Sequence, residues 1–139
     1  MRIEHSLLIA GSIIVGLLAF SIGFAARRTN RLTNGSWGGL HIRMEINNGA
    51  AEIDYDCANG AIGGPLTFDS QGRFSWPGFY TRESHGPIRM GKTPARMSAT
   101  YSGSIKGDTM SLTVKLPDGQ TLDSFTLTRG SSGRVWKCK

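Results

Sequence analysis

The 139-residue chain lacks most of the sequence features that mark enzymes and metal proteins. Its two cysteines, Cys57 and Cys138, are too few and too far apart for a zinc or iron–sulfur signature. No phosphate-binding loop, catalytic triad or paired-carboxylate motif can be located in it. The chain is also too short for two domains beside an N-terminal segment of about 30 residues. We therefore expect one small domain with no metal and no cofactor.

A basic surface of the size that nucleic acid requires is also missing. The formal net charge is +6, but Arg27, Arg28 and Arg31 belong to the N-terminal segment. Residues 32–139 hold twelve Lys or Arg against nine Asp or Glu, a net of +3, and residues 82–96 account for that whole excess. We therefore expect no nucleic-acid partner.

One long uncharged segment, residues 6–26, is present near the N-terminus. Its twenty-one residues are enough to span a bilayer as a helix, whereas the apolar region of a signal peptide is shorter. We expect residues 1–31 to anchor the chain in a membrane through this helix and its basic flank. The alternative is a cleaved signal segment and a secreted domain.

The orientation of this segment depends on two opposing signals. Three arginines follow it while only Arg2 precedes it, and the positive-inside bias would then keep the domain in the cytoplasm. The pair Cys57 and Cys138 favours export, because a disulfide persists in oxidising compartments. This disulfide would close a loop of about 80 residues and stabilise the fold by about 4.5 kcal/mol. We favour a domain in the periplasm or outside a bacterial cell, held at the inner membrane.

Alternation of apolar and polar side chains predicts that residues 32–139 form an all-β domain. Residues 37–47 and 51–57 are expected to pair across the turn Asn48-Gly49, with Ile42 opposite Tyr55. Residues 97–105 and 110–116 are expected to pair with Tyr101 opposite Val114. Further strands are expected at residues 66–68, 73–80, 121–129 and 134–138, with a bulge near Asp123.

Seven or eight short strands joined by tight turns predict an antiparallel meander that closes into a small barrel, with a sandwich as the alternative. Several aromatic side chains must fit inside so small a barrel, so we expect its interior to be filled. Both cysteines are expected on the inner face.

Two resemblances concern the domain. Gly35-Ser36-Trp37 and the late Arg134 resemble the glycine-x-tryptophan and closing arginine of lipocalin-type barrels. Residues 37–138 also resemble a family of small exported bacterial proteins of uncharacterised function. This likeness implies export and a compact β domain, and it implies no activity. Its motifs are Trp37-Gly38-Gly39-x-His41-Ile42, Asp56-Cys57-Ala58, Gly72-Arg73-Phe74, Tyr80-x-Arg82-Glu83, Gly86-Pro87, Pro94-Ala95-Arg96, Tyr101-x-Gly103 and Gly133-Arg134-Val135-x-Lys137-Cys138.

The first candidate site is the long loop that carries the positive charge. Clustered arginines suit carboxylate or phosphate groups, and long loops on β scaffolds often bind ligands. We therefore expect an anionic ligand or an envelope component to contact the domain there, without catalysis. The candidate residues are Arg82, His85, Arg89, Lys92 and Arg96.

The second candidate site is the polar pair His41 and Asp56, which the predicted register places opposite each other. An imidazole beside a carboxylate is oriented as a base, but it is more often a surface ion pair. The alternative function is a small hydrolase or metal-dependent enzyme that uses His41, Asp56, Glu83 and His85. The sequence makes no prediction about oligomeric state.

Overall fold

The computed structural model describes residues 23, 28–83, 91 and 95–138, and within them the regular structure is all β. Apart from Gly23, the predicted membrane segment at residues 6–26 lies outside the described residues. The part of the chain that is described holds no helix long and apolar enough to cross a membrane.

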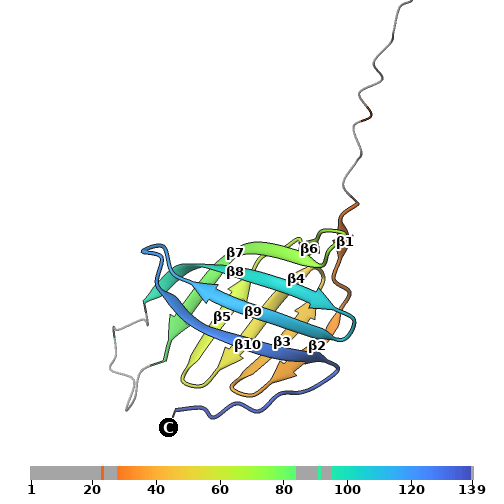
Figure 1. Ribbon diagram of the computed structural model, residues 1–139. Coiled ribbons are helices and arrows are strands. Elements are labelled where there is room, and N and C mark those ends of the chain that lie inside the picture. The colour runs from red at the N-terminus through yellow and green to blue at the C-terminus, as the bar shows by residue number, and fades with distance from the viewer. Residues whose placement is uncertain (1–22, 24–27, 84–90, 92–94, 139) are drawn as a thin grey trace, which may run out of the picture.

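Eight antiparallel strands close into a barrel in the order β10-β2-β3-β4-β5-β7-β8-β9 (Figure 1). This confirms the predicted barrel and excludes the sandwich. Its strands are β2 (Gly35–Gly39), β3 (Ile42–Asn47), β4 (Ala50–Tyr55), β5 (Ala58–Ile62), β7 (Arg73–Arg82), β8 (Arg96–Lys106), β9 (Thr109–Lys115) and β10 (Thr121–Arg129). A two-stranded sheet of β1 (Asn30–Arg31) and β6 (Thr67–Phe68) lies at one end, which we call the β1 end.

The two predicted hairpin registers are confirmed. Ile42 pairs with Tyr55 across β3 and β4, and Tyr101 pairs with Val114 across β8 and β9. In both hairpins the apolar side chains alternate with polar ones, and a shift of one residue in the pairing would place apolar residues opposite polar ones. Between the two hairpins, β5 pairs with β7, and this pairing joins the first and second halves of the chain in one sheet.

Two tight turns were not predicted. Residues 37–47 do not form one strand, because the chain reverses at Leu40 and His41 between β2 and β3. It reverses again at Asp56 and Cys57 between β4 and β5. His41 and Cys57 take the left-handed φ values of 66° and 53° that such turns require and that glycine usually supplies. Because neither of these two positions is a glycine, the sequence gives no signal for the turns.

The predicted last strand at residues 134–138 is also wrong. After β10, the C-terminal tail (residues 130–138) runs along the outside of β2 and crosses the turns at residues 40–41 and 56–57. Its one bridge joins Arg134 to Leu40. Gly38 and Gly133 make this close approach possible, since a Cβ at either residue would overlap the backbone of the opposing segment. We call this end of the barrel the tail end.

Side chains fill the barrel between its two ends, as predicted. Near the β1 end, Leu32 and Leu66 are buried in the core, and the Leu32 N–H donates to the Leu66 carbonyl at 2.9 Å. The buried rings of Phe74 and Trp76, both on β7, stack with their centres 3.8 Å apart. The largest fully buried side chains are Trp37, Tyr101, Ile42, Met44, Ile46, Ile53, Ile62, Leu66, Met110, Leu112, Leu127 and Val114.

Candidate functional site

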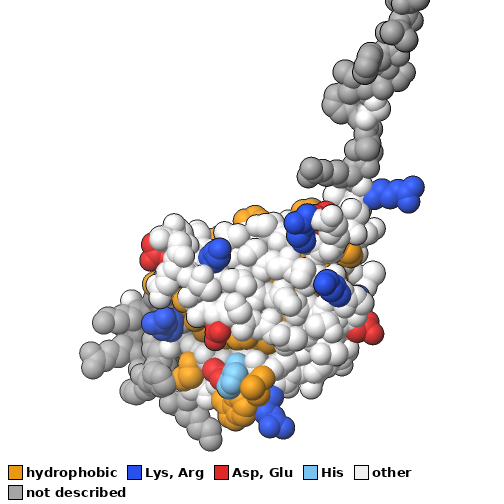
Figure 2. Space-filling view, viewed as in Figure 1, with side chains coloured by type: hydrophobic (Ala, Val, Ile, Leu, Met, Phe, Trp, Pro, Cys, Tyr) orange, Lys and Arg blue, Asp and Glu red, His pale blue; other side chains and the backbone are white. Residues whose placement is uncertain are grey.

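The predicted pair His41 and Asp56 is in direct contact. His41 Nδ1 lies 2.5 Å from Asp56 Oδ2, and the carboxylate accepts this hydrogen bond. The two residues come from the β2–β3 and β4–β5 turns rather than from facing strand positions as predicted. Figure 2 shows the histidine beside acidic and hydrophobic side chains on the lower part of the molecular face.

The C-terminal tail completes this pair. The backbone N–H of Trp136 donates to Asp56 Oδ1 at 2.7 Å. The centre of the Trp136 ring lies 5.0 Å from the centre of the His41 ring. Burial opposes ionisation of Asp56, but the hydrogen bonds from Trp136 and His41, and the nearby Lys137 charge, hold its pKa below the usual value. Asp56 is therefore an ionised carboxylate at neutral pH. Trp136 was predicted to face inward, but it is half exposed.

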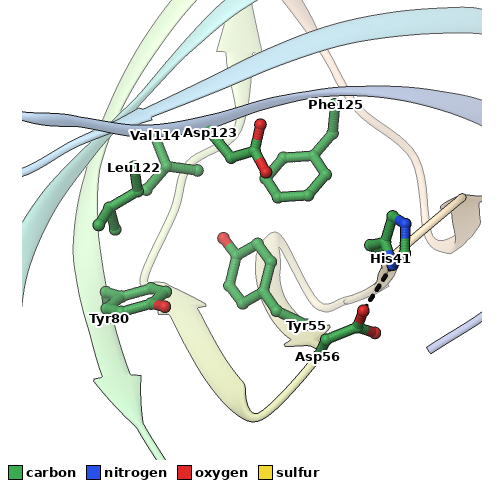
Figure 3. A pocket seen from close by; sticks show the side chains of 8 residues that line it. All are labelled: His41, Tyr55, Asp56, Tyr80, Val114, Leu122, Asp123 and Phe125. Atoms are coloured by element: carbon green, nitrogen blue, oxygen red, sulfur yellow. Dashed lines mark hydrogen bonds and ion pairs between the residues drawn. The ribbon is translucent and has the colours of Figure 1, made fainter. Parts of the chain in front are cut away.

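A cavity of about 310 Å³ opens at the tail end beside this pair (Figure 3). Tyr55 lies at its centre, and the Tyr55 ring lies 5.5 Å from that of Tyr80 and 5.4 Å from that of Phe125. The cavity is thus walled by aromatic rings and rimmed by acidic groups. The residues that line it are His41, Tyr55, Asp56, Tyr80, Val114, Leu122, Asp123 and Phe125.

The Tyr55 hydroxyl is the unusual group of this cavity. It is buried and close enough to Tyr101 to interact electrostatically, yet it has no partner with hydrogen-bonding geometry. The Tyr101 hydroxyl instead donates to the Phe79 carbonyl at 2.6 Å. Burial first, and the neighbouring tyrosines second, raise the pKa of Tyr55 far above the usual value, so the phenol stays neutral. Burying a polar group without a partner costs about 1–3 kcal/mol.

Asp123 reaches the cavity because of an irregularity in β10. The predicted bulge is present, and the register shifts between Thr121 and Asp123. The shift pairs Asp123 with Val114, whose side chain is buried in the barrel. Asp123 remains exposed to solvent but borders the cavity, and Figure 3 shows its carboxylate and the Tyr55 hydroxyl directed toward the same space.

Glu83 belongs to a different polar cluster. Lys137 Nζ lies 2.9 Å from Glu83 Oε1 and 3.0 Å from Asp54 Oδ1, and it donates to the Ala58 carbonyl at 3.1 Å. Burial opposes the charge of Lys137, but these two carboxylates raise the pKa of the lysine above its usual value. Lys137 thus links the C-terminal tail to Asp54 on β4 and to Glu83, which directly follows β7.

The four residues of the enzyme alternative are not assembled among the described residues. His41 and Asp56 meet, Glu83 pairs with Lys137, and His85 lies outside the described residues. Within the described ranges, no three His, Cys, Asp or Glu side chains are grouped to hold a metal ion. No Ser, Thr or Cys is among the side chains that line the cavity.

The predicted basic site is described only at its edges. Arg82 ends β7 as an exposed residue, and Arg96 begins β8 with its guanidinium carbon 3.7 Å from the centre of the Phe79 ring. This ring is on the outer surface, so Arg96 is engaged away from the cavity. His85, Arg89 and Lys92 lie outside the described residues, so the anion site stays a prediction.

Two other residue assignments are resolved by the structure. Cys57 and Cys138 form the predicted disulfide, with Cα atoms 4.9 Å apart, but at the tail end rather than on the inner face. Trp37 is buried, and Arg129 rather than Arg134 lies over its ring, at 4.5 Å. Arg129 also pairs with Asp108 at 3.1 Å.

Comparisons with known proteins found no match. No family model, no curated protein and no solved structure resembles the chain at a significant level.

Sequence reasoning missed Tyr55, Tyr80, Phe125 and Asp123 as a group. Each was considered only within its own strand, and Asp123 only as the place of a bulge. The available signal was that three aromatic residues and an acidic residue all fall on the inner parity near the same ends of β4, β7 and β10. Only the ring closure, in which β10 pairs with β2, brings them together.

Proposed function

We propose that the chain is a non-enzymatic binding module whose cavity at the tail end takes a small organic ligand. The barrel is filled elsewhere, and ligand sites in small barrels lie at their mouths. A cavity of about 150 Å³ is enough for benzene, so the 310 Å³ of this cavity would suit a ring with a short side chain.

The buried Tyr55 hydroxyl is the observation that carries this proposal. Its polar neighbour is the Tyr101 hydroxyl, which already donates to the Phe79 carbonyl, so the Tyr55 hydroxyl is poorly satisfied among aromatic rings. A ligand with one polar group would relieve it. The other side chains that line the cavity converge from three strands and two turns, which gives a ligand several contacts at once.

We further propose that residues 1–31 hold this module at a membrane and that the domain is exported. The uncharged segment and the arginines after it support the anchor, and the pair Cys57–Cys138 supports an oxidising compartment. β1, which follows the segment, lies at the barrel end opposite the cavity (Figure 1). An anchor on that side would leave the cavity accessible.

Cell fractionation tests the location. The full chain should sediment with membranes, and protease added to spheroplasts should degrade the domain. Complete protection from external protease would contradict export, and recovery in the medium would favour cleavage of the segment.

Ligand titration tests the binding function. The probes are 2-phenylethylammonium, 2-phenylethanol and 3-phenylpropionate, which share one ring and differ in charge. The full chain in zwitterionic lipid nanodiscs is titrated by calorimetry, with empty nanodiscs as the blank. At least one probe should bind, and Leu122→Trp should abolish the binding because the indole fills the cavity.

The matched control is Leu40→Trp, in the turn between β2 and β3. Leu40 is exposed and does not line the cavity, so this variant should bind as the wild type does. If none of the three probes binds, or if Leu122→Trp binds them unchanged, the cavity is not a binding site. A purely structural role of the domain in the cell envelope, without a ligand, would then be the better interpretation.

A further inference from the structure

We propose that the ligand of this cavity is an organic cation, a primary or quaternary ammonium compound whose charge lies between Asp123 and Asp56 against the rings of Tyr55, Tyr80 and Phe125. This inference rests on the proposed binding function and specifies the chemistry of its ligand.

The charge of the lining favours a cation. Asp56 and Asp123 are the acidic groups of the cavity wall, and His41 is its one basic group among the described residues. The wall therefore carries a charge of −1 when His41 is protonated and −2 when it is neutral. The nearby Lys137 does not reverse this sign, because it is paired with Glu83 and Asp54.

The two carboxylates differ in how many of their oxygens already accept hydrogen bonds from the protein. Asp56 already accepts hydrogen bonds from His41 and Trp136 through both of its oxygens. Asp123 accepts one from the backbone N–H of Ser124 through Oδ1, at 2.7 Å. Asp123 is therefore the principal anion facing the cavity, and Asp56 adds a fixed negative charge at the opposite rim (Figure 3).

The aromatic walls favour the same class of ligand. The faces of aromatic rings attract ammonium groups within about 6 Å of the ring centre, and cages of several rings recognise quaternary ammonium ligands. Tyr55 contacts both Tyr80 and Phe125, so three rings border one space.

An anionic ligand is disfavoured at this site. Placed beside Asp123, it would meet a like charge, and the Asp56 carboxylate borders the same cavity. The anionic ligand that the sequence predicts would therefore have to bind at another site. The two sites are thus distinguished by the charge that each would accept.

The ranking of the three probes tests this inference. At neutral pH, 2-phenylethylammonium should bind at least about tenfold more tightly than 2-phenylethanol, and 3-phenylpropionate should bind most weakly. Asp123→Asn should weaken binding of the ammonium probe about five- to tenfold and leave the alcohol unchanged. Asparagine keeps an oxygen that can accept from the Ser124 N–H, so the local fold is retained.

Asp118→Asn is the matched control, because Asp118 lies in the β9–β10 turn and does not line the cavity. This variant should keep the wild-type affinity for the ammonium probe. Equal binding of ammonium and alcohol, or tighter binding of the propionate, would overturn the cation class while leaving the binding function in place. Failure of all three probes to bind would instead remove the binding function itself.

Discussion

Two residues in left-handed backbone conformations shape the tail end of the barrel. His41 and Cys57 each hold a positive φ that costs a residue with a Cβ about 1–2 kcal/mol. Contacts of their side chains offset this cost, since His41 binds Asp56 and Cys57 is bonded to Cys138. Loss of the contact between His41 and Asp56, or of the bond between Cys57 and Cys138, should therefore change the shape of the cavity rim.

The pH dependence of stability should reveal the contact between Asp56 and its donors. The pKa of Asp56 in the folded chain is below its ordinary value of 3.8. Its stabilisation is thus present above that ordinary value and is lost as the pH falls through the lower folded value. From about pH 5 to about pH 2, the urea midpoint of Asp56→Asn should fall less than that of the wild type.

Asp118→Asn serves as the control for this measurement, since it removes a carboxylate in a turn whose acceptor role an amide can keep. Its midpoint should follow the wild-type curve. An Asp56→Asn curve parallel to the wild type would show that the contact with His41 and Trp136 contributes nothing to folding.

At the scale of single elements, strand β8 depends on one missing side chain. Gly103 pairs with Leu112, and a Cβ there would overlap the Ser111 carbonyl and press on the Phe74 ring. The backbone of β9 and this ring occupy the space that a side chain would need, which allows the two strands to coil closely.

Gly103→Ala should therefore destabilise the protein by at least about 2 kcal/mol, because the overlap is with backbone that cannot move away. Gly107→Ala, in the β8–β9 turn, is the control: its φ of 57° disfavours alanine, but no atom is near. It should cost only about 1 kcal/mol. Urea unfolding monitored by circular dichroism measures both, and equal effects would contradict the close packing of β8 on β9.

Regular alternation made most of the elements predictable. β3 with β4, and β8 with β9, follow from rows of apolar residues that fit one register parity. The turn at Leu40 and His41 did not follow, because neither residue is a turn former and the alternation continues through them. The tail was misread as a strand because Trp136 and Cys138 keep a period of two, although their contacts are to turns.

The candidate site was predictable only in part. His41 and Asp56 were paired by the correct register, although the reason given was wrong, since both lie in turns. Tyr55, Phe125 and Asp123 come from strands about 70 residues apart in sequence, and no local pattern relates them. Side-chain periodicity specifies which face of a strand is buried, but it does not specify which strands become neighbours when the ring closes.

At the scale of the whole molecule, the disulfide joins the C-terminal tail to the cavity rim. Cys57 and Cys138 are 81 residues apart, so the bond closes most of the domain into one loop. The same tail supplies the Trp136 N–H to Asp56 and the ammonium group of Lys137 to Glu83 and Asp54. Stability and rim geometry should therefore change together when the bond is absent.

Cys138→Ser should lower the free energy of unfolding by about 4.5 kcal/mol, the chain-entropy value for a loop of this length. Urea unfolding of the oxidised wild type and of the variant measures this difference. The reduced wild type is the control and should match the variant, because both lack the same covalent link. An unchanged midpoint would show that the tail is held by its noncovalent contacts alone.

Ring closure has a consequence for how copies of this domain behave toward one another. Each of the eight strands is hydrogen-bonded on both sides, β10 and β2 included. Sheet proteins recruit further chains through unpaired peripheral strands, which act as templates for fibrils and runaway polymerisation. A cylinder of this kind presents no such template from its wall, so the folded domain should stay dispersed at concentrations that would polymerise an open sheet of the same composition.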